Sequence, residues 1–165
     1  MEFNSVKDYF YKLNNRGYQL MMLPLITFAL FYSQPVFKLP ELVLLNQENS
    51  SLLFFVSGVF TLVALTIVQI RTKNQARAIA KEVGLGIKLE RLGTVLTRKM
   101  VAISLTILFI SMALFFTGDS YFAIAFAILF FWYFMQWPTP GRVCRLLNLR
   151  GDEHQMVITR GEAFK

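Results

Sequence analysis

The chain has 165 residues, of which 55% are hydrophobic and only 16% are charged, and its formal net charge is +7. A soluble domain typically carries about 25% charged residues. This composition, with 17 Phe and a mean hydropathy of +0.49, is that of an integral membrane protein. One Cys and one His exclude a multi-His metal site, a Cys-x-x-Cys redox pair and an internal disulfide within one chain.

The N-terminal segment, residues 1–18, carries helix signals. Ser5 and Asp8 resemble a capping box with a shorter acid. Apolar side chains recur at helical spacing on one face, at Val6, Tyr9, Phe10 and Leu13. The segment is therefore predicted to be an amphipathic interfacial helix on the cytoplasmic side of the bilayer. An ordinary cytosolic helix packed on the central loop is the alternative.

Four stretches without Asp, Glu, Lys, Arg or His lie in the predicted membrane domain, residues 19–137. A helix needs about 20 mainly apolar residues to cross the hydrocarbon core, and backbone groups in lipid must pair within their own segment. The predicted spans are 19–37, 52–70, 100–117 and 121–137. The sequence thus predicts an all-α bundle of four transmembrane helices.

Basic residues flank these spans very unevenly. Sixteen of the 17 Lys and Arg lie in residues 1–18, in the loop 71–99 or in the tail 138–165, whereas Lys38 alone lies on the opposite side. Because cytoplasmic loops carry the excess of Lys and Arg, both termini and the central loop are predicted to be cytoplasmic. We expect the protein to lie in a bacterial inner membrane whose cytoplasmic leaflet is anionic.

The loop 71–99 is predicted to extend spans two and three as a cytoplasmic helical hairpin that turns at Gly84-Leu85-Gly86. Its two limbs are rich in helix-forming residues, with apolar faces at Ala76, Ile79, Ala80 and Val83 and at Leu89, Leu92 and Leu96. Short helices lying flat on the membrane are the alternative. The glycines match neither the Walker A nor the dinucleotide-binding spacing, so no cofactor is expected. No nucleic acid is expected either, because the basic residues lie beside apolar spans, where anionic lipid and topology explain them more simply.

The tail is expected to begin with a short amphipathic helix after Gly141, and residues 155–159 are expected to be extended. Cys144 and His154 are the only thiol and imidazole. A nucleophile–base pair is one interpretation, palmitoylation of Cys144 is a second, and a packing role for the thiol is the favoured one.

Two groups of residues are candidate functional sites. The basic residues of the central loop are expected to form a surface for a partner or for anionic lipid: Arg71, Lys73, Arg77, Lys81, Lys88, Arg91, Arg98 and Lys99. Small residues spaced four apart are expected either to pack helices or to line a pore: Ser57, Thr61, Ala102, Thr106, Ala123 and Ala127.

Because the chain lacks a catalytic constellation, the leading hypothesis is a non-catalytic small subunit or scaffold of a larger membrane assembly. A homo-oligomeric passive channel or transporter is the alternative. An enzyme acting on lipid is the third hypothesis, since it would have to use cytoplasmic carboxylates, Cys144 and His154.

Overall fold

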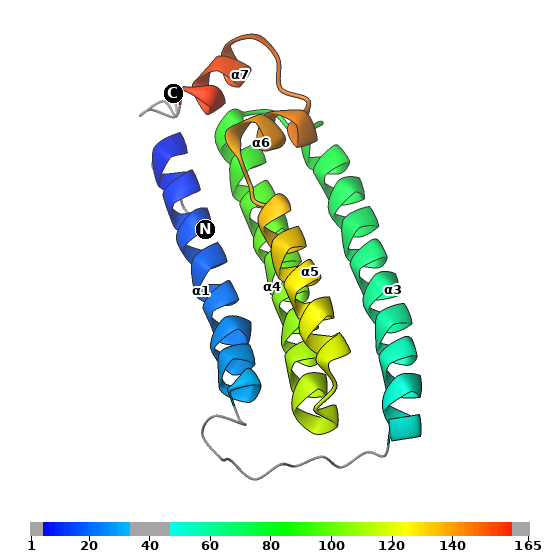
Figure 1. Cartoon of the computed structure of the whole chain (residues 1–165). Helices are drawn as coiled ribbons and strands as arrows, with labels where there is room; N and C mark the ends of the chain where they lie inside the picture. The colour runs from blue at the N-terminus through cyan, green and yellow to red at the C-terminus, as the bar shows by residue number, and fades with distance from the viewer. Residues whose placement is uncertain (1–4, 34–46, 160–165) are drawn as a thin grey trace. The chain divides into compact units, whose positions relative to one another are not determined.

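The computed structural model describes residues 5–33 and 47–159, and these form six α-helices without a β-strand (Figure 1). Their bounds are α1 Val6–Tyr32, α3 Gln47–Ile79, α4 Leu85–Thr117, α5 Ser120–Met135, α6 Pro140–Leu147 and α7 Gly151–Ile158. The prediction of an all-α fold is confirmed. The chain divides into two compact units, described separately below. Unit 1 comprises Met1–Tyr18, Val68–Met100 and Trp137–Lys165, and unit 2 comprises Gln19–Ile67 and Val101–Gln136.

Two helices are long and apolar enough to cross a membrane, namely Leu52–Ile79 of α3 and all of α4. A third candidate arises if α5 and α6, which are bent by 74° at their break, count as one span. The protein is thus an integral membrane protein with two or three candidate spans.

The first and fourth predicted spans differ from the helices that the structure contains. Within the described residues, α1 is not among the candidate spans, and residues 34–37 of the predicted first span lie outside them. The fourth span corresponds to α5, which has 16 residues and is too short to count without α6, because Gln136 caps it just before Pro138.

A separate N-terminal helix was predicted, but α1 runs without a break from Val6 to Tyr32. The predicted start is correct, since the Asp8 backbone N–H donates to Ser5 Oγ at 3.1 Å and satisfies one of the free amides of the first turn. No residue between 16 and 20 stops the helix, and Pro24 lies inside it.

The two helices around the central turn each contain 33 residues, about 50 Å at 1.5 Å per residue. The prediction that spans two and three continue as long helices is confirmed, and the alternative of separate flat helices is wrong. The predicted turn is shifted: it occupies residues 80–84, and Leu85 and Gly86 already belong to α4. Gly84 alone within this turn has a positive φ, 94°, which glycine adopts readily.

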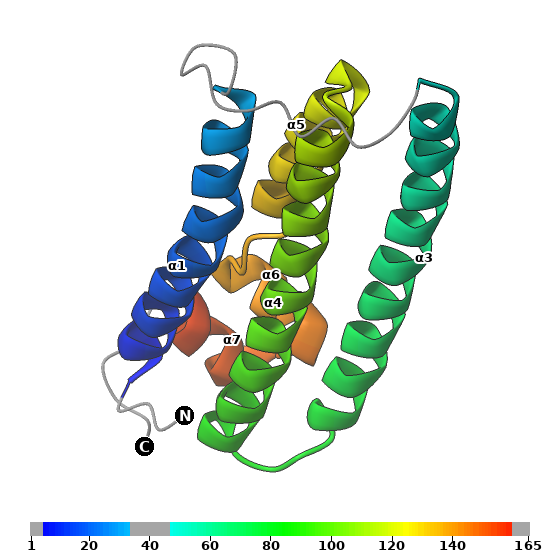
Figure 2. The ribbon, with the colours of Figure 1, turned by 90° about the horizontal axis from the view of Figure 1, so that it is seen from below.

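The core of unit 1 joins segments that are far apart in the sequence. It contains Val6, Tyr9, Phe10 and Leu13 of α1, Ala76 and Ile79 of α3, Leu89, Leu92, Val95 and Leu96 of α4, Val143, Cys144 and Leu147 of α6, and also Leu149 and Val157. Figure 2 shows α6 and α7 beside the first turns of α1 and α4. The predicted apolar faces are therefore buried, except that Ala80 is only partly buried and Val83 is 89% exposed.

Two short helices, α6 and α7, form the described part of the tail and contact each other. The expected helix after Gly141 is present as α6, which starts at Pro140 with proline in the first turn. The expectation of an extended segment at 155–159 is wrong, because α7 continues to Ile158.

Aromatic side chains hold unit 2 together. The rings of Phe28 and Phe126 stack at a centroid distance of 3.8 Å, and Phe54 meets Phe122 edge to face at 5.3 Å. The Ser104 hydroxyl also donates to the Leu20 carbonyl oxygen. Such packing and interhelical hydrogen bonding replace the hydrophobic driving force that is absent between helices in lipid.

Candidate anion-binding cleft

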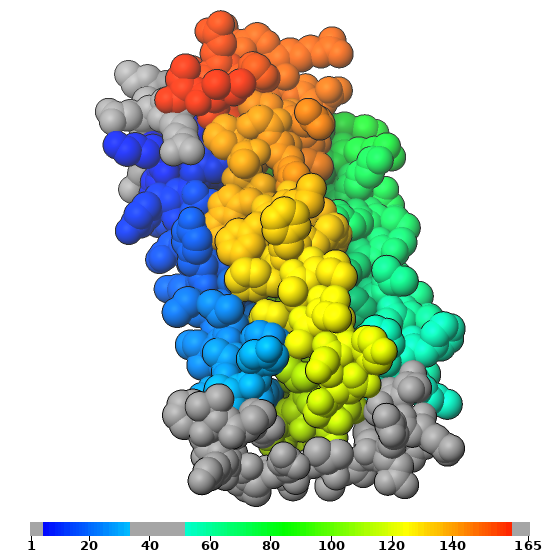
Figure 3. Space-filling model, viewed as in Figure 1, coloured from blue at the N-terminus to red at the C-terminus, as the bar shows by residue number. Residues whose placement is uncertain are grey.

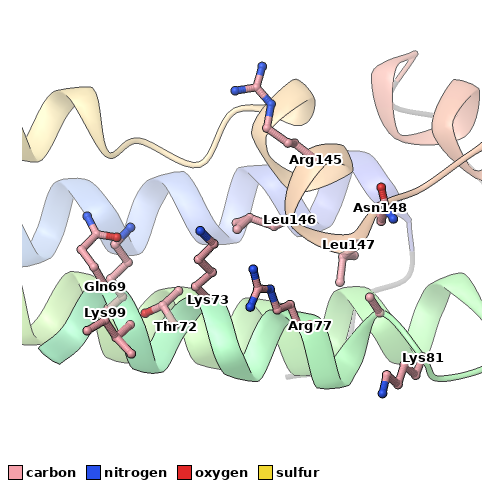
Figure 4. A pocket seen from close by; sticks show the side chains of 12 residues that line it. Gln69, Thr72, Lys73, Arg77, Lys81, Lys99, Arg145, Leu146, Leu147 and Asn148 are labelled. Atoms are coloured by element: carbon pink, nitrogen blue, oxygen red, sulfur yellow. The ribbon is translucent and has the colours of Figure 1, made fainter. Parts of the chain in front are cut away.

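Unit 1 contains an open cleft of about 1120 Å³ between the C-terminal half of α3, Lys99 of α4 and the end of α6 (Figure 4). Its lining consists of Gln69, Ile70, Thr72, Lys73, Arg77, Ala80, Lys81, Lys99, Arg145, Leu146, Leu147 and Asn148. Asn148 ends α6 in the left-handed conformation, and its backbone N–H donates to the Cys144 carbonyl oxygen. This cap turns the chain at the edge of the cleft.

The lining is strongly cationic, with five basic side chains and no acidic one. Lys73 and Arg77 are four residues apart, so they share a face of α3, and Lys81 follows in the turn after this helix. Figure 4 shows Lys73 and Arg77 pointing from α3 toward α6, whereas Lys81 and the Arg145 guanidinium point away. Of these four side chains, Lys73 and Arg77 therefore supply the positive charge that faces the cleft, and Lys99 of α4 also lines it.

Three described acidic groups of unit 1 form ion pairs with cations that do not line the cleft. Lys12 Nζ lies 2.8 Å from Asp8 Oδ2, Lys88 Nζ lies 2.9 Å from Glu153 Oε2, and the Arg91 guanidinium pairs with Glu82.

Within the described ranges, no carboxylate forms an ion pair with Lys73, Arg77 or Arg145. The cleft thus keeps a positive potential, and a concave surface with charge of one sign concentrates counter-ions.

The eight basic residues that the sequence groups into one surface occupy different places. Lys73, Arg77, Lys81 and Lys99 line the cleft. Arg98 lines a smaller hollow of about 340 Å³ together with the Glu82–Arg91 pair, and Lys88 is tied to α7. Arg71 is exposed and lines neither hollow.

Sequence reasoning missed Arg145, Gln69, Thr72 and Asn148 as cleft residues. The signal that could have found Arg145 is its place in the amphipathic helix of the tail, whose apolar side chains Val143 and Leu147 are buried. When an amphipathic helix buries its apolar face, its basic residues lie at the edge of the surface on which the helix packs.

Cys144 and His154 do not form the arrangement of a nucleophile and its base. Cys144 is buried in the core of unit 1, and its Sγ contact is with the His154 backbone oxygen at 4.0 Å. Near it in the same core, burial raises the pKa of the Tyr9 phenol above its ordinary value. Among the residues that the structure describes, no three His, Cys, Asp or Glu side chains gather at one place.

The predicted packing or pore-lining residues also differ from one another in burial and in hydrogen bonding. Ser57 is buried and donates to the Phe54 carbonyl oxygen at 3.0 Å, and Thr106 donates to the Ala102 oxygen at 2.9 Å. Thr61 is buried, and its hydroxyl has no hydrogen-bond partner among the described residues. On α5, Ala123 is half-buried and Ala127 is exposed.

The fold and the cleft define a class, an all-α integral membrane protein whose more polar unit carries a cationic cleft. Comparisons with protein-family models, with curated proteins and with solved structures gave no match.

Proposed function

We propose that the protein is a non-catalytic small subunit or scaffold of a larger membrane assembly. In this proposal the predicted spans 19–37 and 121–137 join the two long helices in a four-helix membrane domain. Unit 1 faces the cytoplasm of a bacterial cell together with both termini. The bias of 16 basic residues toward one side supports this orientation.

The observation that carries the proposal is the exposure of α3. The apolar segment of α3 is 17% buried within the protein, whereas that of α4 is 50% buried. Large side chains project from one face of α3 at Phe55, Val59 and Leu62, which are spaced three and four residues apart and so share that face. An unusually wide apolar face on one helix provides the contact surface that a subunit of a membrane complex needs.

The aromatic residues of α5 contribute less to such a surface than its sequence suggests. Phe122, Phe126 and Tyr133 are buried, so they pack within the protein. Side chains of α5 that do reach the surface (Figure 3) include Ile124, Ile128 and Phe131. The exposed apolar side chains of α3 therefore support the proposed partner contact more strongly than those of α5.

A pair of triple variants tests the proposal in the native membrane. Replacing Phe55, Val59 and Leu62 by alanine keeps α3 apolar but removes its projecting side chains. We expect the yield of co-purified, crosslinked partner polypeptide in mild detergent to fall at least about tenfold, because a few large side chains carry most interface energy.

The matched control replaces Ile124, Ile128 and Phe131, which have the same spacing on α5, and should leave the yield unchanged. Equal partner yields from the two triple variants, or wild-type protein that crosslinks to no other polypeptide, would count against the proposal.

The Thr61 hydroxyl is the one observation that favours a passive channel. A buried hydroxyl without a partner costs free energy in a dry interface but not beside water in a pore. Under our proposal, Thr61→Val removes an unsatisfied hydroxyl. The free energy of unfolding should then stay the same or rise by up to about 2 kcal/mol. Purified protein in liposomes should conduct no solute before or after the change. Solute flux that Thr61→Val alters would instead establish the channel.

A further inference from the structure

We propose that the cleft of unit 1 binds a phosphate group, with Lys73 and Arg77 as its main ligands. The proposal names a ligand class for the cleft, and it does not depend on the accessory-subunit proposal. It rests on four features of the cleft. These are the spacing of its cations, the lack of described acidic partners for them, their depth relative to the membrane and the size of the cleft.

The arrangement of the two cations suits a phosphate. Lys73 and Arg77 are one helical turn apart on α3, which is about 6 Å along the axis, and both point toward α6 (Figure 4). Arginine offers a planar fork of donors that matches two phosphate oxygens, and lysine adds a compact point charge. The two side chains can therefore reach different oxygens of one group.

Among the described residues, no acidic side chain pairs with Lys73 or Arg77. The carboxylates of Asp8, Glu82 and Glu153 pair with cations outside the cleft, and no described acidic side chain lines it. Lys73 and Arg77 lie one turn apart on α3, so their like charges repel one another unless an anion joins them. A bound phosphate would remove that repulsion and form charge-assisted hydrogen bonds.

The depth of the cations favours a lipid as the source of the phosphate. The apolar run of α3 ends at Ile70, so Lys73 lies about 4–5 Å and Arg77 about 10 Å further along the helix. The headgroup layer on each side of the hydrocarbon core is about 5–8 Å thick. Lys73 thus lies within the depth of lipid phosphates, and the backbone of Arg77 lies just beyond it.

The size and composition of the cleft favour a ligand larger than a bare ion. Its volume of about 1120 Å³ is slightly above the range of about 300–1,000 Å³ that is usual for small-molecule sites. Ile70, Leu146 and Leu147 give it an apolar side, and the amides of Gln69 and Asn148 add polar groups. A phosphate that carries a glycerol or acyl portion matches this combination.

Lipid binding to the full-length protein, measured by native mass spectrometry, tests the proposal. The probes are phosphatidylglycerol, phosphatidylcholine as the lipid without net charge, and inorganic phosphate and glycerol 3-phosphate as soluble competitors. The test variant is Lys73→Gln/Arg77→Gln. The matched control is Arg71→Gln/Arg98→Gln, which removes the same charge from exposed residues outside the cleft.

We expect the cleft variant to bind phosphatidylglycerol at least about 30-fold more weakly than wild type, because each lost charge-assisted hydrogen bond costs about tenfold in affinity. The control should change the affinity by less than about threefold. A charge-conserving variant, Lys73→Arg, should stay within threefold, and unchanged elution in size-exclusion chromatography shows that the variants are folded.

The competitors identify the source of the phosphate. Displacement by glycerol 3-phosphate or inorganic phosphate at concentrations similar to that of the lipid indicates a soluble phosphate compound, and resistance to them indicates a lipid. The proposal is overturned if the cleft variant and the control variant lose the same affinity for phosphatidylglycerol. It is also overturned if the cleft variant binds both phosphatidylglycerol and the soluble phosphate compounds as tightly as wild type does.

Discussion

Leu92→Ala is expected to increase the labelling rate of Cys144 by a thiol reagent about 30-fold or more. Leu92 is fully buried in the core of unit 1, where it belongs to the same cluster as Cys144. Truncating a buried leucine to alanine costs about 2–5 kcal/mol through lost burial and the cavity that remains. The buried thiol reacts only when its surroundings open, so the labelling rate follows the free energy of that opening.

Cys144 is the single cysteine of the chain, so the wild-type protein in mild detergent needs no added label site. The control is Ile87→Ala, which lies on the same helix but is half exposed and does not belong to the core cluster. We expect it to change the labelling rate by less than about twofold, because exposed substitutions usually stay within ±0.5 kcal/mol. Equal rates for the two variants would show that the core of unit 1 is not assembled as described.

Gly17→Leu is expected to destabilise unit 1 by about 2 kcal/mol or more. A Cβ at position 17 would lie 2.9 Å from Trp137 Cη2. The indole cannot easily move, because its Nε1–H donates to Asn14 Oδ1 at 2.9 Å and its ring lies 4.7 Å from that of Tyr18. Overpacking costs about 1–3 kcal/mol, and displacing the indole also breaks the hydrogen bond.

Trp137 fluorescence in a Trp132→Phe background reports the displacement as a red shift, and thermal unfolding in detergent reports the lost stability. Gly141→Leu is the matched control, since nothing lies within 4 Å of the Cβ position of Gly141. It should leave both readouts unchanged or raise the melting temperature slightly, because leucine is the better helix former. A stable Gly17→Leu protein with unshifted emission would refute the packing of Trp137 on α1.

Local signals in the sequence predicted most of the helices. Ser5 starts α1 as its position before an apolar periodic segment indicates, and the continuous apolar runs of α3 and α4 require helices in lipid. Side chains such as Leu89 and Leu92 are buried as their spacing predicts. Each of these features depends on residues within one or two helical turns.

Helix ends limited the predictions elsewhere. Val83 fits the apolar face of α3 by spacing, but α3 ends at Ile79, and beyond that end the periodicity no longer places a side chain in the core. Gly17 shows the opposite case. Glycine often marks a helix end, but Gly17 lies inside α1 and accommodates Trp137 from a distant segment.

The cleft could be predicted only in part. Lys73, Arg77 and Lys81 are recognisable as one face of a helix, but nothing local indicates that α6 covers that face while Lys88 and Arg91 find acidic partners. The spacing of Ala123 and Ala127 likewise fits any helix contact, and Ala127 is exposed. Which residues assemble into a site depends on contacts between segments, which a single sequence does not encode in its periodicity.

The mass of the wild-type protein, released in mild detergent from its native membrane and measured by native mass spectrometry, shows whether the chain belongs to a larger assembly. We predict species heavier than the 19.0 kDa chain, which contain a second kind of polypeptide and at least one tightly bound anionic phospholipid. A bare 19.0 kDa chain, or a homo-oligomer without lipid or partner, would contradict both proposals.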